Sequence, residues 1–187
     1  MGKEIIIVTI SLGNDGAERI LTELARQWHH DGHKITVIQT SPNRYGTEYA
    51  LPEGIEQIQI HTTSSNKILR FLQEIKALIG ILKQRPNATC LSFLSASSFI
   101  LAIGSWFVNN RMVFSERNNP RKVPVGKHQQ MLRDFAFRFA DAIVFQTEDA
   151  KSYFSKSIQS RGHIIPNPIN GNLPEPYEGE REKIIVT

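Results

Sequence analysis

Cysteine is nearly missing from this sequence, and so is any long apolar run. The 187 residues contain a single cysteine, Cys90, which excludes an internal disulfide framework and fits a reducing compartment. No apolar run approaches the ~20 residues that a membrane-spanning helix needs, and no signal peptide is expected at the start. These absences argue against disulfide-rich secreted proteins and membrane-spanning proteins, and they predict a cytoplasmic location.

A dinucleotide-binding pattern is also lacking. The first loop contains Gly13-x-x-Gly16 rather than G-x-G-x-x-G. The second expected strand ends in Gln39-Thr40-Ser41, which offers no carboxylate to hold a ribose hydroxyl. NAD binding is therefore disfavoured, and no cofactor is predicted. Three histidines near Gly32 have neither a neighbouring cysteine nor the spacing of a ligand set, so no metal site is predicted either.

Positive charge is distributed unevenly along the chain. The formal net charge is +4, yet the segment from Arg111 to Arg138 alone holds seven basic and two acidic residues. A local excess of positive charge suits the phosphates of a nucleotide, a diphosphate-linked lipid or an anionic membrane surface. A solvated basic face is the structural alternative. No nucleic-acid partner is predicted.

Strand-like and helix-like segments alternate over residues 1–165. Ile5–Ile10 is a continuous run of mostly β-branched residues, typical of a parallel strand that is buried on both faces. Further strands are expected at 34–40, 55–61, 88–94, 111–115, 142–145 and 163–165. Helices are expected after the first strand and at 64–82, 97–107, 128–140 and 148–156. This alternation predicts an α/β, Rossmann-like parallel sheet with helices on both faces.

The chain continues past this predicted domain. Pro166-Asn167-Pro168 opens a polar stretch that predicts an interdomain linker over 166–182. Residues 183–187 are predicted to open the first strand of a second domain, because a lone apolar strand needs partners for its backbone groups. The sequence therefore predicts the first half of a two-domain protein, with the working site between the halves.

Ligands of parallel sheets bind beyond the carboxyl ends of the strands, so the loops that follow the strands are the candidate sites. After the first strand, Gly13, Asn14 and Gly16 stand at the start of a helix, where free backbone amides favour anions. We expect a phosphate group there. The structural alternative is that the glycines only form a tight turn.

The loop after the fifth strand has the richest polar chemistry. It reads Ser115-Glu116-Arg117-Asn118-Asn119-Pro120, and its hydroxyl, carboxylate, guanidinium and amide groups suit sugar hydroxyls or a phosphate. The alternative is a simple turn in which Glu116 pairs with Arg117. Ser95, after the fourth strand, is able to line the same cleft or simply to begin a helix.

The predicted helix over His128–Ala140 suggests a membrane contact. Its predicted inward stripe, at a spacing of 3.6 residues, is Met131, Leu132, Phe135 and Phe139. Arg133, Phe137 and Arg138 fall elsewhere around the helix, and an exposed Phe between arginines suits the interface of an anionic membrane. Coverage of Phe137 by the preceding loop is the alternative.

Five segments resemble, in order and spacing, the N-terminal domain of family-four glycosyltransferases, which are two-domain enzymes of the GT-B fold. They are Leu12-Gly13-x-x-Gly16-Ala17-Glu18-Arg19, Gly32-His33-x-Ile35-Thr36-Val37, Ser115-Glu116-Arg117-Asn118, Ala140-Asp141-Ala142-Ile143-Val144 and Ile164-Ile165-Pro166-Asn167-Pro168-Ile169. The match runs across the chain. The members that look most similar build bacterial surface polysaccharides or lipid-linked oligosaccharides.

The resemblance implies a retaining transfer of a sugar from a nucleotide-diphosphate donor to a glycan or a polyprenyl-diphosphate-linked acceptor. In the family the glycine loop lies near the donor diphosphate, here Gly13 and Gly16, and the N-terminal domain mainly holds the acceptor. Many members have a histidine where this chain has Arg117, so a catalytic role does not carry over, and Arg117 and Glu116 are only candidates. Without its nucleotide-binding partner domain, the chain is expected to be nearly inert.

Two other functions fit the same features. A nucleotide-sugar epimerase of GT-B architecture would share the sheet and would need no lipid docking. A non-catalytic glycan- or nucleotide-binding module would bind a ligand without turning it over. A paired-glutamate motif in a following domain would favour sugar transfer over the binding module.

Overall fold

A parallel sheet of seven strands organises the protein, in a computed structural model that describes residues 2–13, 16–41, 50–93 and 95–168. The strand order is β3-β2-β1-β4-β5-β6-β7. The strands are β1 (Glu4–Thr9), β2 (Lys34–Gln39), β3 (Glu56–Gln59), β4 (Thr89–Ser92), β5 (Arg111–Glu116), β6 (Ala142–Phe145) and β7 (Gly162–Ile164). The predicted α/β, Rossmann-like sheet is confirmed.

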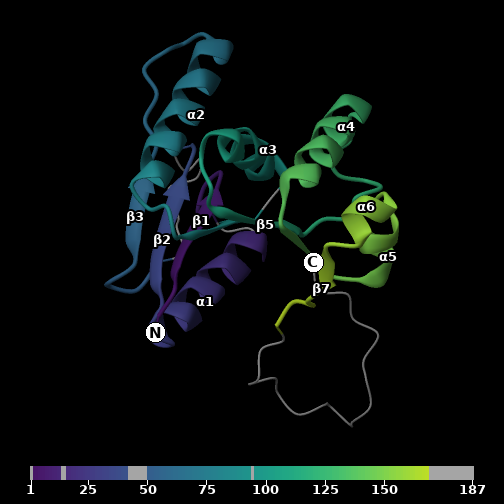
Figure 1. Ribbon diagram of the computed structural model, residues 1–187, viewed down its shortest axis with the longest axis horizontal. Coiled ribbons are helices and arrows are strands. Elements are labelled where there is room, and N and C mark those ends of the chain that lie inside the picture. The colour runs from purple at the N-terminus through teal and green to yellow at the C-terminus, as the bar shows by residue number, and fades with distance from the viewer. Residues whose placement is uncertain (1, 14–15, 42–49, 94, 169–187) are drawn as a thin grey trace, which may run out of the picture.

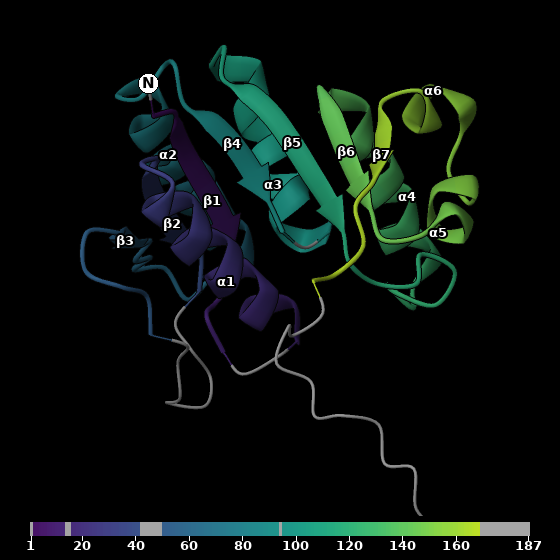
Figure 2. The ribbon, with the colours of Figure 1, turned by 90° about the horizontal axis from the view of Figure 1, so that it is seen from below.

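Helices cover both faces of the sheet. Helix α1 (Gly16–His30) lies on one face, and α2 (Lys67–Lys83), α3 (Ser95–Gly104) and α4 (Lys127–Ala136) lie on the other (Figure 1, Figure 2). The short helices α5 (Glu148–Ser152) and α6 (Lys156–Gln159) lie near the β7 edge. Right-handed crossovers explain this division, because the chain steps from β1 to β2 in one direction and from β3 through β7 in the other.

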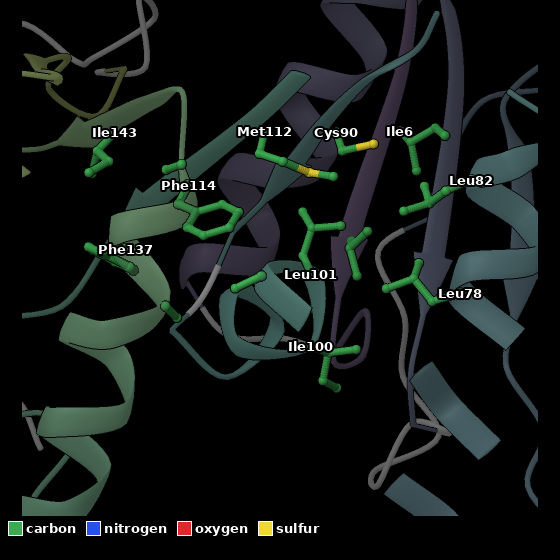
Figure 3. Close-up of a cluster of buried hydrophobic side chains, with 14 of the residues drawn as sticks. Ile6, Leu78, Leu82, Cys90, Ile100, Leu101, Met112, Phe114, Phe137 and Ile143 are labelled. Atoms are coloured by element: carbon green, nitrogen blue, oxygen red, sulfur yellow. The ribbon is translucent and has the colours of Figure 1, made fainter. Parts of the chain in front are cut away.

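The core forms one apolar layer on each side of the sheet. Side chains alternate along β1, so Ile6 and Val8 join the layer beneath α2, α3 and α4, whereas Ile7 joins the layer beneath α1. Figure 3 shows the larger layer, with side chains from β1, β4, β5 and β6 and from the helical segments that cover them: Ile6, Leu78, Leu82, Cys90, Ile100, Leu101, Met112, Phe114, Phe137 and Ile143. These two layers hold the carboxyl ends of the strands in fixed positions.

Cys90 lies in β4, inside the larger layer, and is fully buried. Burial raises the pKa of its thiol to about 12, because an apolar surrounding disfavours the charged thiolate. We therefore expect iodoacetamide to leave the native protein unlabelled at mildly alkaline pH while it labels the guanidinium-unfolded chain completely. Mass spectrometry measures the added mass. Equal labelling of the two states would contradict the buried position.

Side-chain caps explain where two helices begin. The Oδ1 atom of Asn66 accepts hydrogen bonds from the backbone N–H groups of Ile68 (2.9 Å) and Leu69 (3.3 Å). Helix α2 starts at the residue directly after Asn66. The Oγ1 atom of Thr147 accepts one from Ala150 N–H (3.1 Å) and caps α5. The helix expected over 148–156 is instead the two short helices α5 and α6.

The exposed and buried sides of α4 are the reverse of the prediction. Phe137 is 0% exposed and Arg133 is 2% exposed, so the prediction that these two residues contact a membrane is wrong. The predicted inward stripe is also wrong at three of its four positions, since the exposed fractions are 69% for Met131, 47% for Leu132 and 45% for Phe135. Phe139 does pack against the core, and Arg138 is exposed.

The neighbours of α4 explain this reversal. The helix ends at Ala136 and continues as a 3₁₀ turn over Phe137–Phe139, which shifts the directions of the following side chains. Phe137 then packs on Phe154, with ring centroids 5.3 Å apart. Arg133 lies over the same ring, at 4.9 Å. The segment around Phe154 therefore covers the side of α4 that the apolar spacing had assigned to solvent.

Strand β7 is the last described strand, and residues 165–168 follow it. The remainder of the predicted linker and the predicted strand over 183–187 lie outside the described residues, and so does Asn14 of the glycine loop.

Candidate functional site

A cleft of about 530 Å³ lies beyond the carboxyl ends of β1, β5, β6 and β7. It is bordered by the first turns of α1 and by the segments after β5, β6 and β7, through Gly16, Ala17, Glu18, Ile20, Arg117, Asn118, Gln146 and Asn167. This edge is where parallel α/β sheets bind their ligands, because the helix starts and the free loop groups converge there. The strand order thus brings together groups from four separate parts of the chain.

Arg117 supplies the positive charge of the cleft. Its guanidinium lies over the Phe93 ring, 4.9 Å from the ring centroid, and its Nη2 donates a hydrogen bond to Asn167 Oδ1. Burial lowers the pKa of the Arg117 guanidinium, yet an arginine stays protonated in proteins. Its Nε–H is buried and has no partner among the described residues. A half-buried cation with an unused donor suits a phosphate or a sugar hydroxyl.

Two amide side chains complete this side of the cleft. The Oδ1 atom of Asn167 accepts a hydrogen bond from Gln146 Nε2 (3.1 Å) as well as the one from Arg117. The flanking Pro166 and Pro168 restrict the backbone around Asn167. The start of the predicted linker is therefore joined to the loops after β5 and β6, and it forms part of the site.

The glycine loop reaches the cleft at Gly16. A Cβ atom on Gly16 would meet nothing within 4 Å, so the start of α1 is open toward a ligand. Gly13 lies behind it, where an added Cβ would be 3.1 Å from Glu18 Oε2. Glu18 is buried, and its Oε1 accepts a hydrogen bond from Ser11 Oγ (3.0 Å). The loop is thus closed on the Glu18 side and leaves the Gly16 side for an anion.

Comparison with known families identifies the chain. A family model described as Glycosyltransferase Family 4 matches residues 14–172. The chain belongs to glycosyltransferase family 4. The comparison with curated proteins finds no match.

Solved structures show the same fold in this family 4 domain and in larger proteins. Anabaena HepE, solved with UDP and glucose, has a TM-score of 0.69 at 11% identity over 90% of this chain and 45% of HepE. The lipopolysaccharide outer core galactosyltransferase WaaB gives 0.69 at 11% identity over 89% of this chain and 46% of WaaB. The UDP-N-acetylglucosamine 2-epimerase of Rickettsia bellii gives 0.60 at 14% identity, over 87% and 44%. The chain thus spans less than half the length of each of these proteins.

Two further predicted site residues of the family 4 domain, Ser115 and Asn119, lie outside the cleft lining. Ser115 is buried and lines an apolar cavity beside α1, on the sheet face that also contains Phe93 and Val113. The Oδ1 atom of Asn119 accepts a hydrogen bond from Arg121 N–H (3.0 Å), so Asn119 shapes the turn. Ser95 begins α3, and its side chain lies outside the described part of the chain.

Glu116 is buried beneath the cleft and does not line it. Its Oε1 accepts a hydrogen bond from Asn118 N–H (3.1 Å), and its Oε2 lies 3.8 Å from Arg133 Nη1. In the described part of the chain, the ion pair of Glu116 is with Arg133 and not with Arg117. Glu116 therefore holds the loop in shape, which leaves the guanidinium of Arg117 available to a ligand.

Gln146 and Asn167 line the cleft, although neither was among the predicted site residues. Gln146 comes directly after β6 and Asn167 comes shortly after the end of β7, and position after a strand was the available signal. Within the residues that the structure describes, no group of three His, Cys, Asp or Glu side chains could hold a metal ion. No described helix is both long enough and apolar enough to cross a bilayer.

Proposed function

We propose that this domain is the acceptor-side half of a retaining glycosyltransferase, which moves a sugar from a nucleotide-diphosphate donor to a glycan or a polyprenyl-diphosphate-linked acceptor. The observation that carries the proposal is the cleft in a family 4 chain, where the half-buried Arg117 guanidinium keeps an unused donor opposite the open start of α1. The pathway that fits is cell-surface polysaccharide biosynthesis, on the cytoplasmic side of the cell membrane.

Each group of the cleft has a role in this reaction. The bond between the sugar C1 and the donor diphosphate breaks as C1 bonds to an acceptor oxygen, so negative charge grows on the leaving diphosphate. The helix start at Gly16 and the Arg117 guanidinium are placed to stabilise that charge. The amides of Asn118, Gln146 and Asn167 suit hydroxyl groups of the sugars.

The donor nucleotide belongs to a second domain in this proposal. The UDP and glucose complex of HepE supports a nucleotide-sugar donor. Closure of the two domains would exclude water and bring donor and acceptor together. The 187-residue chain alone should then transfer sugar far more slowly than an intact enzyme of the family.

Replacing Arg117 with alanine tests the role of the cleft. We expect the Arg117→Ala variant to bind inorganic diphosphate, the part of the donor that this cleft is proposed to contact, about tenfold more weakly or worse, because one charge-assisted hydrogen bond is lost. Chemical-shift titration of the ¹⁵N-labelled chain measures the dissociation constant. Arg121→Ala is the matched control, since Arg121 is exposed and lies outside the cleft lining. Equal affinity of the Arg117 variant and the wild-type chain would refute the proposed donor contact.

The epimerase stays a second candidate because of the likeness to the Rickettsia bellii enzyme. An epimerase converts a nucleotide sugar without any acceptor, whereas a transferase needs one. Incubation of the protein with UDP-N-acetylglucosamine alone, followed by NMR of the sugar, separates the two. Binding of a nucleotide sugar without any conversion, with or without an acceptor, would instead favour a binding module.

A further inference from the structure

The outer side of the α2–α3–α4 layer exposes an unusual amount of apolar surface. Its exposed large apolar side chains are Ile68, Leu69, Leu72, Met131, Leu132 and Phe135. On α2, Ile68 and Leu72 lie on the same stripe as the buried residues Ile75, Leu78 and Leu82, but in the first turns of the helix, where the stripe is exposed. Exposed apolar groups in single positions are ordinary, but six on the helices of one layer indicate an interaction surface.

A groove of about 380 Å³ lies between α2, α3 and α4, and Leu132 of these six residues lines it. It is lined by side chains of α2, α3 and α4 and of the loop before α4: Phe71, Phe99, Ile100, Pro124, Gln129, Leu132 and Arg133. In Figure 1, α2 and α4 rise on either side of α3. We name the six apolar residues together with this groove the outer helical surface.

Positive charge is concentrated on the same helices. Residues 66–84 and 119–138 contain nine basic and two acidic residues, whereas the remainder of the chain contains 13 basic and 16 acidic residues. The two acids of these segments, Glu74 and Asp134, each pair with an arginine of the same helix. Eight of the nine basic side chains are exposed, the exception being Arg133. The charge of this side of the protein is therefore strongly positive, and the charge elsewhere is slightly negative.

Basic residues at the starts of α2 and α4 support the same conclusion. Helix α2 begins with Lys67 and α4 with Lys127, and neither has an acid in its first turn. Cations at a helix N-terminus oppose the helix dipole, so they do not serve the stability of these helices. Along α4 and the 3₁₀ turn that follows it, the exposed residues Lys127, Met131, Phe135 and Arg138 follow one another three or four residues apart. Basic and apolar groups thus share one stripe, which is the pattern of helices that lie in a membrane interface.

We propose that the outer helical surface docks on an anionic lipid bilayer, with Met131, Phe135 and Leu72 entering the interface while the exposed lysines and arginines contact lipid headgroups. Charge complementarity selects this partner, because a second copy of the chain would bring one basic surface against another. The membrane contact proposed here excludes Arg133 and Phe137, which are buried, and consists of residues that are exposed to solvent. It deepens the proposed function, since a polyprenyl-linked acceptor lies in a membrane, but lipid binding itself requires no sugar transfer.

Vesicle sedimentation tests the proposal with the full chain. We expect binding to phosphatidylcholine vesicles that contain phosphatidylglycerol, little binding to pure phosphatidylcholine, and weaker binding as salt increases. The Lys127→Glu/Arg138→Glu variant should bind at least about tenfold more weakly, because each basic group near the surface strengthens binding about fivefold. The Met131→Ser/Phe135→Ser variant should also lose about tenfold or more, through lost insertion.

Lys3→Glu/Lys156→Glu is the matched charge control. Both of its lysines are exposed, and neither belongs to α2, α3 or α4. We expect this variant to bind within about twofold of the wild-type chain, because neither lysine belongs to the outer helical surface. Far-UV circular dichroism checks that every variant is folded.

Equal binding of the control and the Lys127/Arg138 variant, or no preference for anionic vesicles, would overturn the proposal. So would a dimer in sedimentation equilibrium that the Met131/Phe135 variant abolishes while vesicles stay unbound. Sugar-transfer results do not enter this test, so it fails or succeeds separately from the proposed function.

Discussion

Replacing Arg133 with methionine should lower the free energy of unfolding by about 3–5 kcal/mol, because the change removes one partner from a buried network of charge and hydrogen bonds. Arg133 Nη1 donates hydrogen bonds to the backbone oxygens of Pro120 (3.0 Å) and Val123 (2.9 Å). It also lies 3.8 Å from the buried Glu116 carboxylate. Arg133 therefore holds the loop that carries the candidate site to α4 at two points.

Methionine separates the electrostatic loss from a packing loss. Its length is similar to that of the arginine stem, so the cavity left beside Tyr153 and Phe154 is small. The two backbone oxygens and the Glu116 carboxylate would stay buried without their cation, and leaving such groups unpaired is what destabilises the folded state. The same change should loosen the loop at Asn118, whose backbone N–H donates to Glu116 Oε1.

Urea unfolding followed by circular dichroism measures the loss. Arg138→Met is the matched control on the following turn, where the side chain is exposed, and we expect it to change stability by less than about 0.5 kcal/mol. The double variant Glu116→Gln/Arg133→Met should recover part of the loss, since it removes both charges of the pair. An Arg133→Met variant as stable as the Arg138→Met control would show that the network contributes nothing.

Local patterns predicted the sheet well because its central strands, such as β1, β2 and β4, are mostly buried. The β-branched run at Ile5–Ile10 became β1, and Asn66, one of three expected caps, begins α2. Boundaries moved by a few residues where the outcome depends on hydrogen bonds to other strands. The expected strand at 55–61, for example, shortened to Glu56–Gln59, the four residues that pair with β2.

The site could be predicted only in part, for a physical reason. Position after a strand pointed to Gly16, Arg117 and Asn118, and all three line the cleft. Gln146 and Asn167 join them because β6 and β7 lie next to β5, and the order of strands in a sheet is set by packing over long distances. Whether Glu116 faces the cleft or the core depends likewise on Arg133, a partner 17 residues away in the sequence that no local pattern indicates.

The reversal of α4 has the same origin. Apolar spacing tells which residues share one side of a helix, but it does not tell which side faces the sheet when a neighbouring segment covers the other. Phe154 provides a buried ring for both Phe137 and Arg133, and this contact outweighs the burial of Met131 and Leu132. The sequence pattern thus identified residues that share one side of the helix, but it assigned that side to the core instead of to solvent.

Replacing Phe137 with alanine should likewise destabilise the fold by about 3–5 kcal/mol, because a fully buried ring is removed and a cavity stays behind. The ring packs between Phe114 and Phe154, with centroids 6.0 Å and 5.3 Å away, inside the layer drawn in Figure 3. The expected fall in Tm is about 10 °C for a chain of this size. Differential scanning calorimetry measures it.

Phe135→Ala is an unusually close control, since it removes the same side chain two residues earlier, from a position that is 45% exposed. We expect it to destabilise the protein by about 1 kcal/mol or less, yet to weaken binding to anionic vesicles, whereas Phe137→Ala should bind vesicles like the wild-type chain at a temperature where it is folded. The two phenylalanines thus separate stability from membrane docking. A Phe137→Ala variant with unchanged Tm and lost vesicle binding would reverse both assignments, because it would place Phe137 at the lipid surface and Phe135 in the core.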